Sequence, residues 1–175
     1  MGRQRAYGIE GSVRHDAPSY RVIANAAWSR AKRKYDPRTL PGWQPYSLDQ
    51  PVRFNILFAT RAATWNFGTR LTVVSGNPAR VVPEGTLLGE MDTPSVLTRL
   101  PTFWQLDVRV DRTWDRRWGE LRLFFDIQNV TNHRNVEARD NRIEFDPQTN
   151  QSHYEYDDVL GIPIIPFIGV ELAPN

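Results

Sequence analysis

The chain has 175 residues, of which 40% are hydrophobic and 24% are charged, and its formal net charge is +2 at pH 7. Basic and acidic residues are interleaved, which argues against a nucleic-acid interface, because such interfaces gather their cations. The absence of cysteine excludes disulfides, thiol catalysis and thiolate metal sites. Mean hydropathy is −0.53, and no window approaches the roughly 20 consecutive apolar residues of a membrane-spanning helix.

The first half of the chain predicts four strands, because apolar and polar residues alternate there with period two. The first strand is expected at about 4–14 and the second, after a short turn, at about 20–32. The segment 33–48 contains three prolines and is expected to be a loop. The third and fourth strands are expected at about 52–61 and 64–75.

The clearest alternation follows a second long loop, expected at 76–96. Leu106, Val108 and Val110 fall on one face of a strand that runs to Trp114. A three-residue turn, Asp115-Arg116-Arg117, is expected between Trp114 and Trp118, and the next strand continues to about residue 128. Tryptophans at strand ends are typical of membrane-spanning barrels, where they lie at the lipid interface.

The connections alternate between short and long along the chain. The longest one, at 129–161, is expected to contain a small hairpin around 146–150, and the last strand is expected at about 164–172. Loops longer than about 12–15 residues are uncommon in compact domains. Three of them at one end of an antiparallel meander are typical of outer-membrane barrels, which have short periplasmic turns and long extracellular loops. The sequence therefore predicts an all-β fold, an antiparallel up-and-down meander of about seven strands that is a segment of a large transmembrane β-barrel.

A set of short motifs stands in a fixed order along nearly the whole chain. In chain order they are Ala6-Tyr7-Gly8-Ile9-Glu10, Ser75-Gly76-Asn77-Pro78, Arg99-Leu100-Pro101, Leu106-Asp107-Val108-Arg109-Val110-Asp111, Phe125-Asp126-Ile127-Gln128-Asn129-Val130-Thr131-Asn132, Asn135-Val136, and Ile162-Pro163-Ile164-Ile165-Pro166-Phe167-Ile168-Gly169-Val170. Their order and spacing resemble the C-terminal part of a TonB-dependent outer-membrane receptor. The resemblance implies a barrel of about 22 strands with a plug, which takes up metal chelates, vitamins or glycans with energy from TonB.

The resemblance implies that residues 1–175 are the C-terminal portion of such a barrel, with the plug domain absent. We therefore expect a fragment of a receptor in the outer membrane of a Gram-negative bacterium, with no enzymatic activity and no cofactor. Its expected partners are outer-membrane lipid, the missing plug and the remaining barrel strands, and TonB only through the missing N-terminal part. Members of the family usually end on an aromatic residue, whereas this chain ends on Asn175.

The candidate site residues are polar side chains on the face that would line the lumen. They are Arg53, Arg70, Asp107, Arg109, Asp111, Arg122, Asp126 and Gln128. They are interpreted either as contacts to a ligand or plug or, preferably, as a cross-strand charge ladder. Aromatic residues of the long loops are candidate ligand contacts: Trp43, Tyr46, Tyr154 and Tyr156.

Two further loop features have competing interpretations. Asn129 and Asn132 are expected to cap a turn through their side chains, in preference to binding a ligand. His153 lies near Glu155, Asp157 and Asp158, but no ligand spacing supports a calcium site. Motifs of serine hydrolases, nucleotide-binding loops and zinc proteases are absent from the sequence.

The alternative to a receptor barrel is a small soluble β-sheet binding module. The two differ in what covers the apolar face, because an uncovered apolar sheet is unfavourable in water. No helix is predicted that would cover it. This apolar face is expected to contain a broad band of large side chains: Phe54, Ile56, Phe58, Phe67, Leu71, Leu123, Phe125 and Ile127.

Overall fold

The computed structural model describes residues 3–34, 42–89 and 95–174 of the chain, and in these ranges it contains strands and no helix. The strands are β1 Arg3–Asp16, β2 Tyr20–Lys34, β3 Trp43–Pro45, β4 Val52–Ala62, β5 Trp65–Val74, β6 Pro78–Val81, β7 Val96–Arg99, β8 Phe103–Arg116, β9 Gly119–Gln128, β10 Val136–Asp146, β11 Gln151–Leu160 and β12 Ile165–Pro174. Among the described residues, no helix is long and apolar enough to cross a membrane.

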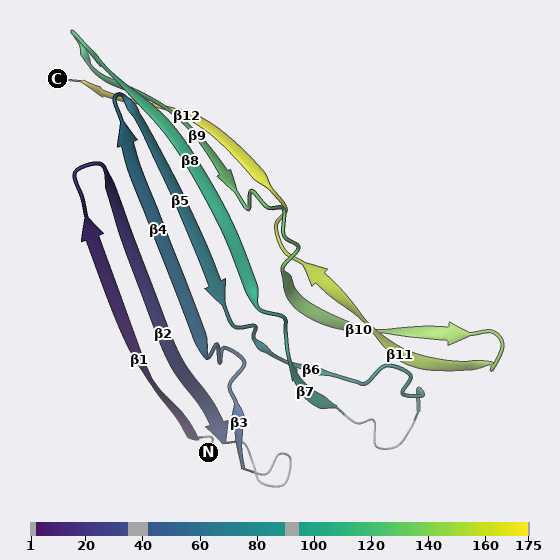
Figure 1. Cartoon of the computed structure of the whole chain (residues 1–175). Helices are drawn as coiled ribbons and strands as arrows, with labels where there is room; N and C mark the ends of the chain where they lie inside the picture. Colours follow the sequence, from purple (N-terminus) through teal and green to yellow (C-terminus); the bar gives the residue numbers. More distant parts are fainter. Residues whose placement is uncertain (1–2, 35–41, 90–94, 175) are drawn as a thin grey trace.

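The main sheet is an antiparallel meander of seven long strands in the order β1-β2-β4-β5-β8-β9-β12, with the short β3 beside β2 (Figure 1). Each long strand pairs with the next long strand along the chain. Short turns close the pairs β1-β2, β4-β5 and β8-β9 at one end of the sheet. The all-β meander of seven strands that the alternation predicts is therefore confirmed.

The long connections contain more structure than the sequence indicates. The connection after β2 contains β3, and the one after β5 contains the β6-β7 pair, where only loops were expected. Parts of both predicted loops, residues 35–41 and 90–94, lie outside the described residues. The hairpin predicted around 146–150 exists but is much larger than expected, because β10 and β11 pair along nearly their whole lengths. It projects away from the main sheet (Figure 1).

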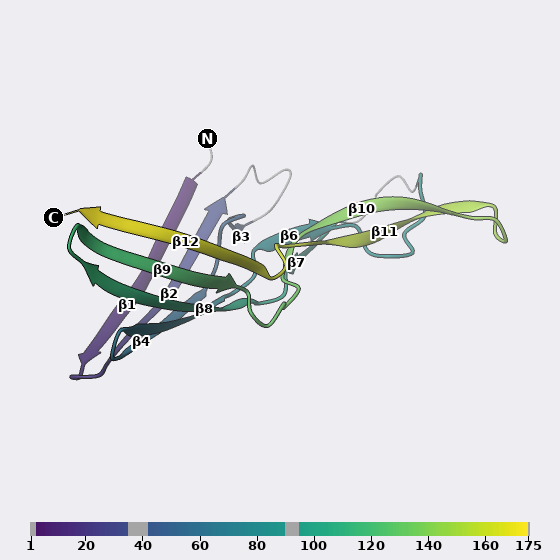
Figure 2. The same ribbon diagram turned by 90° about the horizontal axis from the view of Figure 1, so that it is seen from above.

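The main sheet is curved and twisted, and its strands change direction from β1 to β12 (Figure 2). The chain exposes 12343 Å² of surface, whereas a compact protein of 20.2 kDa exposes about 8,700 Å². In the part of the chain that the structure describes, the only buried apolar side chains are Val74, Val81 and Leu100. All three belong to the β5–β8 connection or its borders, so the sheet has no hydrophobic core of its own.

The two faces of the sheet differ in chemistry because side chains alternate along each strand. The apolar face includes Phe58 and, in cross-strand register with one another, Phe67, Val110 and Phe125. We call the opposite side the polar face. Every Asp and Glu of the seven long strands lies on it; they are Glu10, Asp16, Asp107, Asp111, Asp115, Glu120, Asp126 and Glu171.

Candidate functional site

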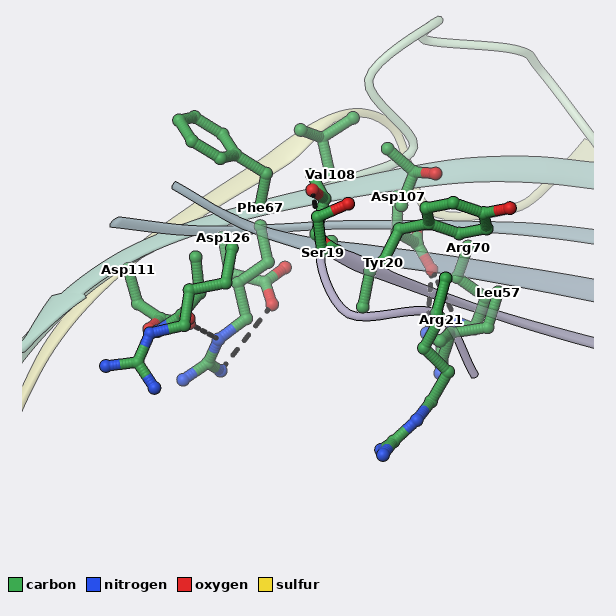
Figure 3. A pocket seen from close by; sticks show the side chains of 18 of the residues that line it. Ser19, Tyr20, Arg21, Leu57, Phe67, Arg70, Asp107, Val108, Asp111 and Asp126 are labelled. Atoms are coloured by element: carbon green, nitrogen blue, oxygen red, sulfur yellow. Dashed lines mark hydrogen bonds and ion pairs between the residues drawn. The ribbon is translucent and has the colours of Figure 1, made fainter. Parts of the chain in front are cut away.

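The polar face carries the candidate functional site. The cross-strand register places all eight sequence-predicted residues on it: Arg53, Arg70, Asp107, Arg109, Asp111, Arg122, Asp126 and Gln128. Figure 3 shows the separation of the two faces, with Phe67 and Val108 on one side of the ribbon and Arg21 and Asp111 on the other. Period-two alternation in the sequence is therefore sufficient to assign these residues to one surface.

Asp107 on β8 is the best-connected carboxylate of the polar face. Its Oδ2 accepts hydrogen bonds from Nη2 and Nε of Arg70 on β5, at 2.7 and 3.0 Å. Its Oδ1 accepts from Gln105 at 2.6 Å and from the backbone N–H of Asn129 at 3.0 Å. Asp107 is only 7% exposed, so these contacts replace the water that a buried carboxylate needs.

Arg109 lies at the centre of a second group of charges. Its guanidinium is 3.6 Å from Asp111, 3.9 Å from Asp126 and 3.6 Å from Glu171. Arg122 forms a closer pair with Glu171 at 3.1 Å. These contacts join β8, β9 and β12 with alternating charges, which is the cross-strand ladder preferred at the sequence level.

An aromatic ring is inserted into this ladder. Phe124 lies on the polar face, and the guanidinium of Arg109 lies 4.1 Å from the centre of its ring. A Cβ atom on Gly169 of β12 would be 2.3 Å from the same ring. The absence of a side chain at Gly169 therefore lets the far end of the ring approach β12 closely, while its face lies under Arg109.

The polar face is hollowed beside the ladder. A concavity of about 750 Å³ is lined by residues of β2, β4, β5, β8 and β9, including Arg21, Leu57, Arg70, Arg109 and Asp126 (Figure 3). The charges that line it are mostly paired with one another, so the surface is polar and nearly neutral. Arg53 and Gln128 lie toward the long-connection end, where Arg53 donates to Gln50 at 3.1 Å.

A buried carboxylate that the sequence did not indicate anchors the long connections to the sheet. Asp49 is 2% exposed. It accepts a hydrogen bond from the backbone N–H of Ala31 at 2.7 Å and pairs with Arg99 at 2.8 Å and Arg30 at 3.5 Å. Arg99 also donates to the carbonyl oxygen of Gly76 at 2.7 Å. One ion-pair cluster thus ties β2, the β3–β4 connection and β7 together.

The protonation of Asp49 follows from these contacts. Burial of the carboxyl raises its pKa. The hydrogen bonds from Ala31 and Arg99 and the charges of both guanidinium groups outweigh burial, and they leave the pKa of Asp49 below its ordinary value. The carboxylate is therefore charged throughout the neutral range, and the anchor is intact there.

Three asparagines organise the connection that leaves β9. Asn129 is buried, and its φ is 51°. Its side chain closes a turn onto His133. Its Nδ2 donates to the carbonyl oxygen of His133 at 2.9 Å, and its Oδ1 accepts from the N–H of His133 at 3.0 Å. The capping role of Asn129 is confirmed. Asn132 acts at longer range and accepts from the N–H of Ile164 at 3.1 Å. Asn135, which the sequence analysis named only as part of a motif, exchanges two hydrogen bonds with the backbone of Trp104.

The four aromatic candidates of the loops do not form one site. Trp43 lies on β3 and Tyr46 just after it, whereas Tyr154 and Tyr156 lie on β11, and both figures show these strands apart (Figures 1 and 2). The guanidinium of Arg5 lies 4.3 Å from the centre of the Trp43 ring. That of Arg139 lies 4.7 Å from the centre of the Tyr156 ring.

The acidic residues around His153 are paired with arginines. Glu155 lies 2.7 Å from Arg142, and Asp158 lies 2.6 Å from Arg139. The register of the hairpin places Asp158 on the opposite face from His153. Within the described ranges, no group of three or more His, Cys, Asp or Glu side chains has the arrangement of a metal site.

Comparisons with known proteins give no relative for the chain. No family model matches it, and neither a curated protein nor a solved structure is similar enough to count as a match. The two faces of the sheet and the motifs of the sequence are therefore the features that indicate a function.

Proposed function

We propose that the seven-stranded sheet is part of the wall of an outer-membrane β-barrel, with the apolar face in contact with lipid and the polar face toward the lumen. We further propose that the barrel is that of a TonB-dependent receptor, which takes up metal chelates, vitamins or glycans. The order of the sequence motifs supports the receptor class. The observation that carries the barrel proposal is the exposed apolar face with aromatic residues at both ends.

The aromatic residues at the two ends of the apolar face are separated by a distance that matches the thickness of a membrane's apolar layer. Tyr7, Trp28 and Trp104 lie on the apolar face toward the long connections, and Tyr20, Trp65 and Trp114 lie on it toward the short turns. Trp104 and Trp114 are ten residues apart on β8, which corresponds to about 33 Å along a strand. With the usual tilt of about 40°, the height is about 25 Å, which equals the apolar band of a membrane barrel.

The exposure of the apolar face supports the same proposal. Ile9, Val13 and Ile168 are 70% or more exposed, and Phe125 is 45% exposed, although all are large apolar side chains. In the described ranges no helix and no second sheet packs on them. Water would penalise such a surface, whereas lipid would not.

The edges of the sheet also support a larger wall. Within the described residues, β1 pairs only with β2, and β12 pairs only with β9. In hydrocarbon each unpaired backbone group costs several kcal/mol, so both edges require further strands. Because the long strands alternate in direction and β1 and β12 run the same way, an odd number of additional strands closes an all-antiparallel barrel.

Spin labels on single cysteines test which face meets lipid, and the cysteine-free sequence makes such variants simple to prepare. Thr69 and Thr72 are a matched pair on β5, both half-buried, with Thr69 on the apolar face and Thr72 on the polar face. In phospholipid vesicles, a label at Thr69→Cys is expected to collide mainly with oxygen. A label at Thr72→Cys is expected to collide mainly with a water-soluble nickel chelate. Equal access of the chelate to both labels would contradict the barrel proposal.

Solution behaviour separates this proposal from the soluble binding module. We expect the 175-residue chain to associate or precipitate in detergent-free buffer, because its apolar face and strand edges are exposed. We also expect it to transport nothing by itself. Size-exclusion chromatography with light scattering is the measurement. A monodisperse monomer with a cooperative melting transition would favour the soluble module.

A further inference from the structure

A group of cations lies on the apolar side of the sheet, just beyond its aromatic residues. Arg3 and Arg5 at the start of β1 are opposite Lys34 and Lys32 at the end of β2, and Arg30 is opposite Tyr7. These pairs share the face of Ile9 and Trp28, because cross-strand partners and every second residue point to the same side. We call Arg3, Arg5, Arg30, Lys32 and Lys34 the basic rim.

Within the part of the chain that the structure describes, most of the basic rim has no acidic partner. Arg30 is 3.5 Å from Asp49, but among the described residues no ion pair is formed by Arg3, Arg5, Lys32 or Lys34. All carboxylates of the long strands lie on the opposite face, as described above. The rim is therefore a local excess of positive charge at one end of the apolar face, whereas Arg112 and Arg116 lie on the same face near its other end.

The aromatic residues beside the rim fix its position relative to the apolar band. Trp28 and Tyr7 are in contact, with ring centres 5.9 Å apart, at the end of the apolar band that is nearest the long connections. Lys32 is four residues beyond Trp28, which corresponds to about 13 Å along the strand and about 10 Å along a membrane normal. The headgroup layer extends about 5–8 Å beyond the hydrocarbon, and flexible Lys and Arg side chains reach back toward it. The ring of Trp43 under Arg5 adds an aromatic group at the same level.

We propose that the basic rim binds the phosphate groups of anionic lipids in the leaflet next to the long connections. The proposal rests on the lipid-facing assignment of the apolar face. Phosphate offers several charged acceptor oxygens, and the rim supplies guanidinium and ammonium donors from two adjacent strands. A nucleic acid carries the same phosphate, but its binding surface does not continue into an exposed band of Ile9, Val13 and Trp28. Lipid satisfies both parts of the surface at once.

Vesicle flotation of the full 175-residue chain, refolded from urea, tests the proposal. The two vesicle types are pure phosphatidylcholine and an equal mixture of phosphatidylcholine with phosphatidylglycerol. The test variant is Arg3→Gln, Arg5→Gln, Lys32→Gln and Lys34→Gln together. The matched control changes four exposed arginines elsewhere, Arg61→Gln, Arg80→Gln, Arg134→Gln and Arg142→Gln, and lowers the net charge equally.

Each cation near an anionic leaflet contributes about fivefold to partitioning, so the test variant is expected to lower the anionic-to-zwitterionic partition ratio at least tenfold at low salt. The control variant is expected to keep the ratio of the unmodified chain. Equal losses in both variants would show that only net charge matters and would overturn the proposal. Stronger binding of the unmodified chain to an oligonucleotide than to anionic vesicles would overturn it too.

The two proposals fail in different ways. If the chain inserts into phosphatidylcholine vesicles but shows no preference for the anionic mixture, the basic rim has no lipid-binding role and the barrel proposal stands. If the chain floats with neither vesicle type and the labels at Thr69 and Thr72 are equally accessible to the chelate, both proposals fail.

Discussion

Replacement of Phe125 by arginine is the sharpest test of the lipid-facing surface. Phe125 lies on the apolar face between Val110 and Ile168 and is 45% exposed. Val110 is six residues from Trp104 and four from Trp114, so Phe125 lies near the middle of the apolar band. An arginine at that depth on the lipid face destabilises a membrane barrel by about 2–4 kcal/mol.

Two further variants control for the arginine itself. Leu121 lies on the same face opposite Trp114, at the edge of the band, where Leu121→Arg is expected to cost only about 0–1 kcal/mol. Gln128→Arg, on the polar face, is expected to cost little because that side chain would meet the water-filled lumen in the proposed barrel. The free energy of unfolding is measured by urea titration from phospholipid vesicles with tryptophan fluorescence. Equal costs for Phe125→Arg and Leu121→Arg would refute the assigned membrane position, and a negligible cost for both would refute contact with lipid.

Three other predictions concern the polar contacts of the connections. Asp49→Asn removes the charge that pairs with Arg99, so the anchor is expected to lose about 1.5–3 kcal/mol, measured as faster proteolysis of the β5–β8 connection. The pKa of Asp49 is lower in the folded chain than in the unfolded chain. The stabilisation that its carboxylate contributes is therefore present above the unfolded pKa of about 4, and it is lost as the pH falls through the folded pKa. The same proteolysis assay, repeated during an acid titration, follows this loss. Asn129→Ala leaves the N–H and carbonyl of His133 without their side-chain partner, and it is expected to lower the free energy of unfolding by about 1–3 kcal/mol, measured by thermal or urea unfolding. Asn129→Asp keeps the acceptor oxygen and is expected to cost less. Gly76→Ala would bring a Cβ within 2.0 Å of a backbone carbonyl and is expected to lower stability by about 1–3 kcal/mol, whereas Gly85→Ala, in open space, is expected to strain only its own φ.

The main sheet is predictable from the sequence because period-two alternation is a local signal. The first part of β8, from Trp104 to Asp111, alternates strictly, and the tight turns between paired strands leave one antiparallel register. The same alternation assigns Arg70 and Asp107 to one face, although only the structure shows that they pair. Sequence reasoning thus identified the surface but not its hydrogen bonds.

The long connections were not predictable in the same way. β6, β7 and the segment after β6 depend on contacts with distant residues, such as the hydrogen bond from the Gly85 N–H to the Tyr154 carbonyl at 2.9 Å. Asp49 gave no signal because its partners, Arg30 and Arg99, are far from it in sequence. The sequence analysis did not identify the basic rim, because the position of these cations on the apolar side follows only from the register of β1 and β2.

The order of pairing in the sheet has a consequence for how the chain folds. β1-β2, β4-β5 and β8-β9 are hairpins with short turns, so each forms from local contacts at little loop-closure cost. The pairing of β9 with β12 is different, because Gln128 and Ile165 meet across a long connection that contains the β10-β11 hairpin. We therefore expect the hairpins to form early and the last edge to pair late. A pulse-labelling experiment during refolding should show protection of the Val110 amide, which faces β9, before that of the Gly169 amide, which faces β9 from β12.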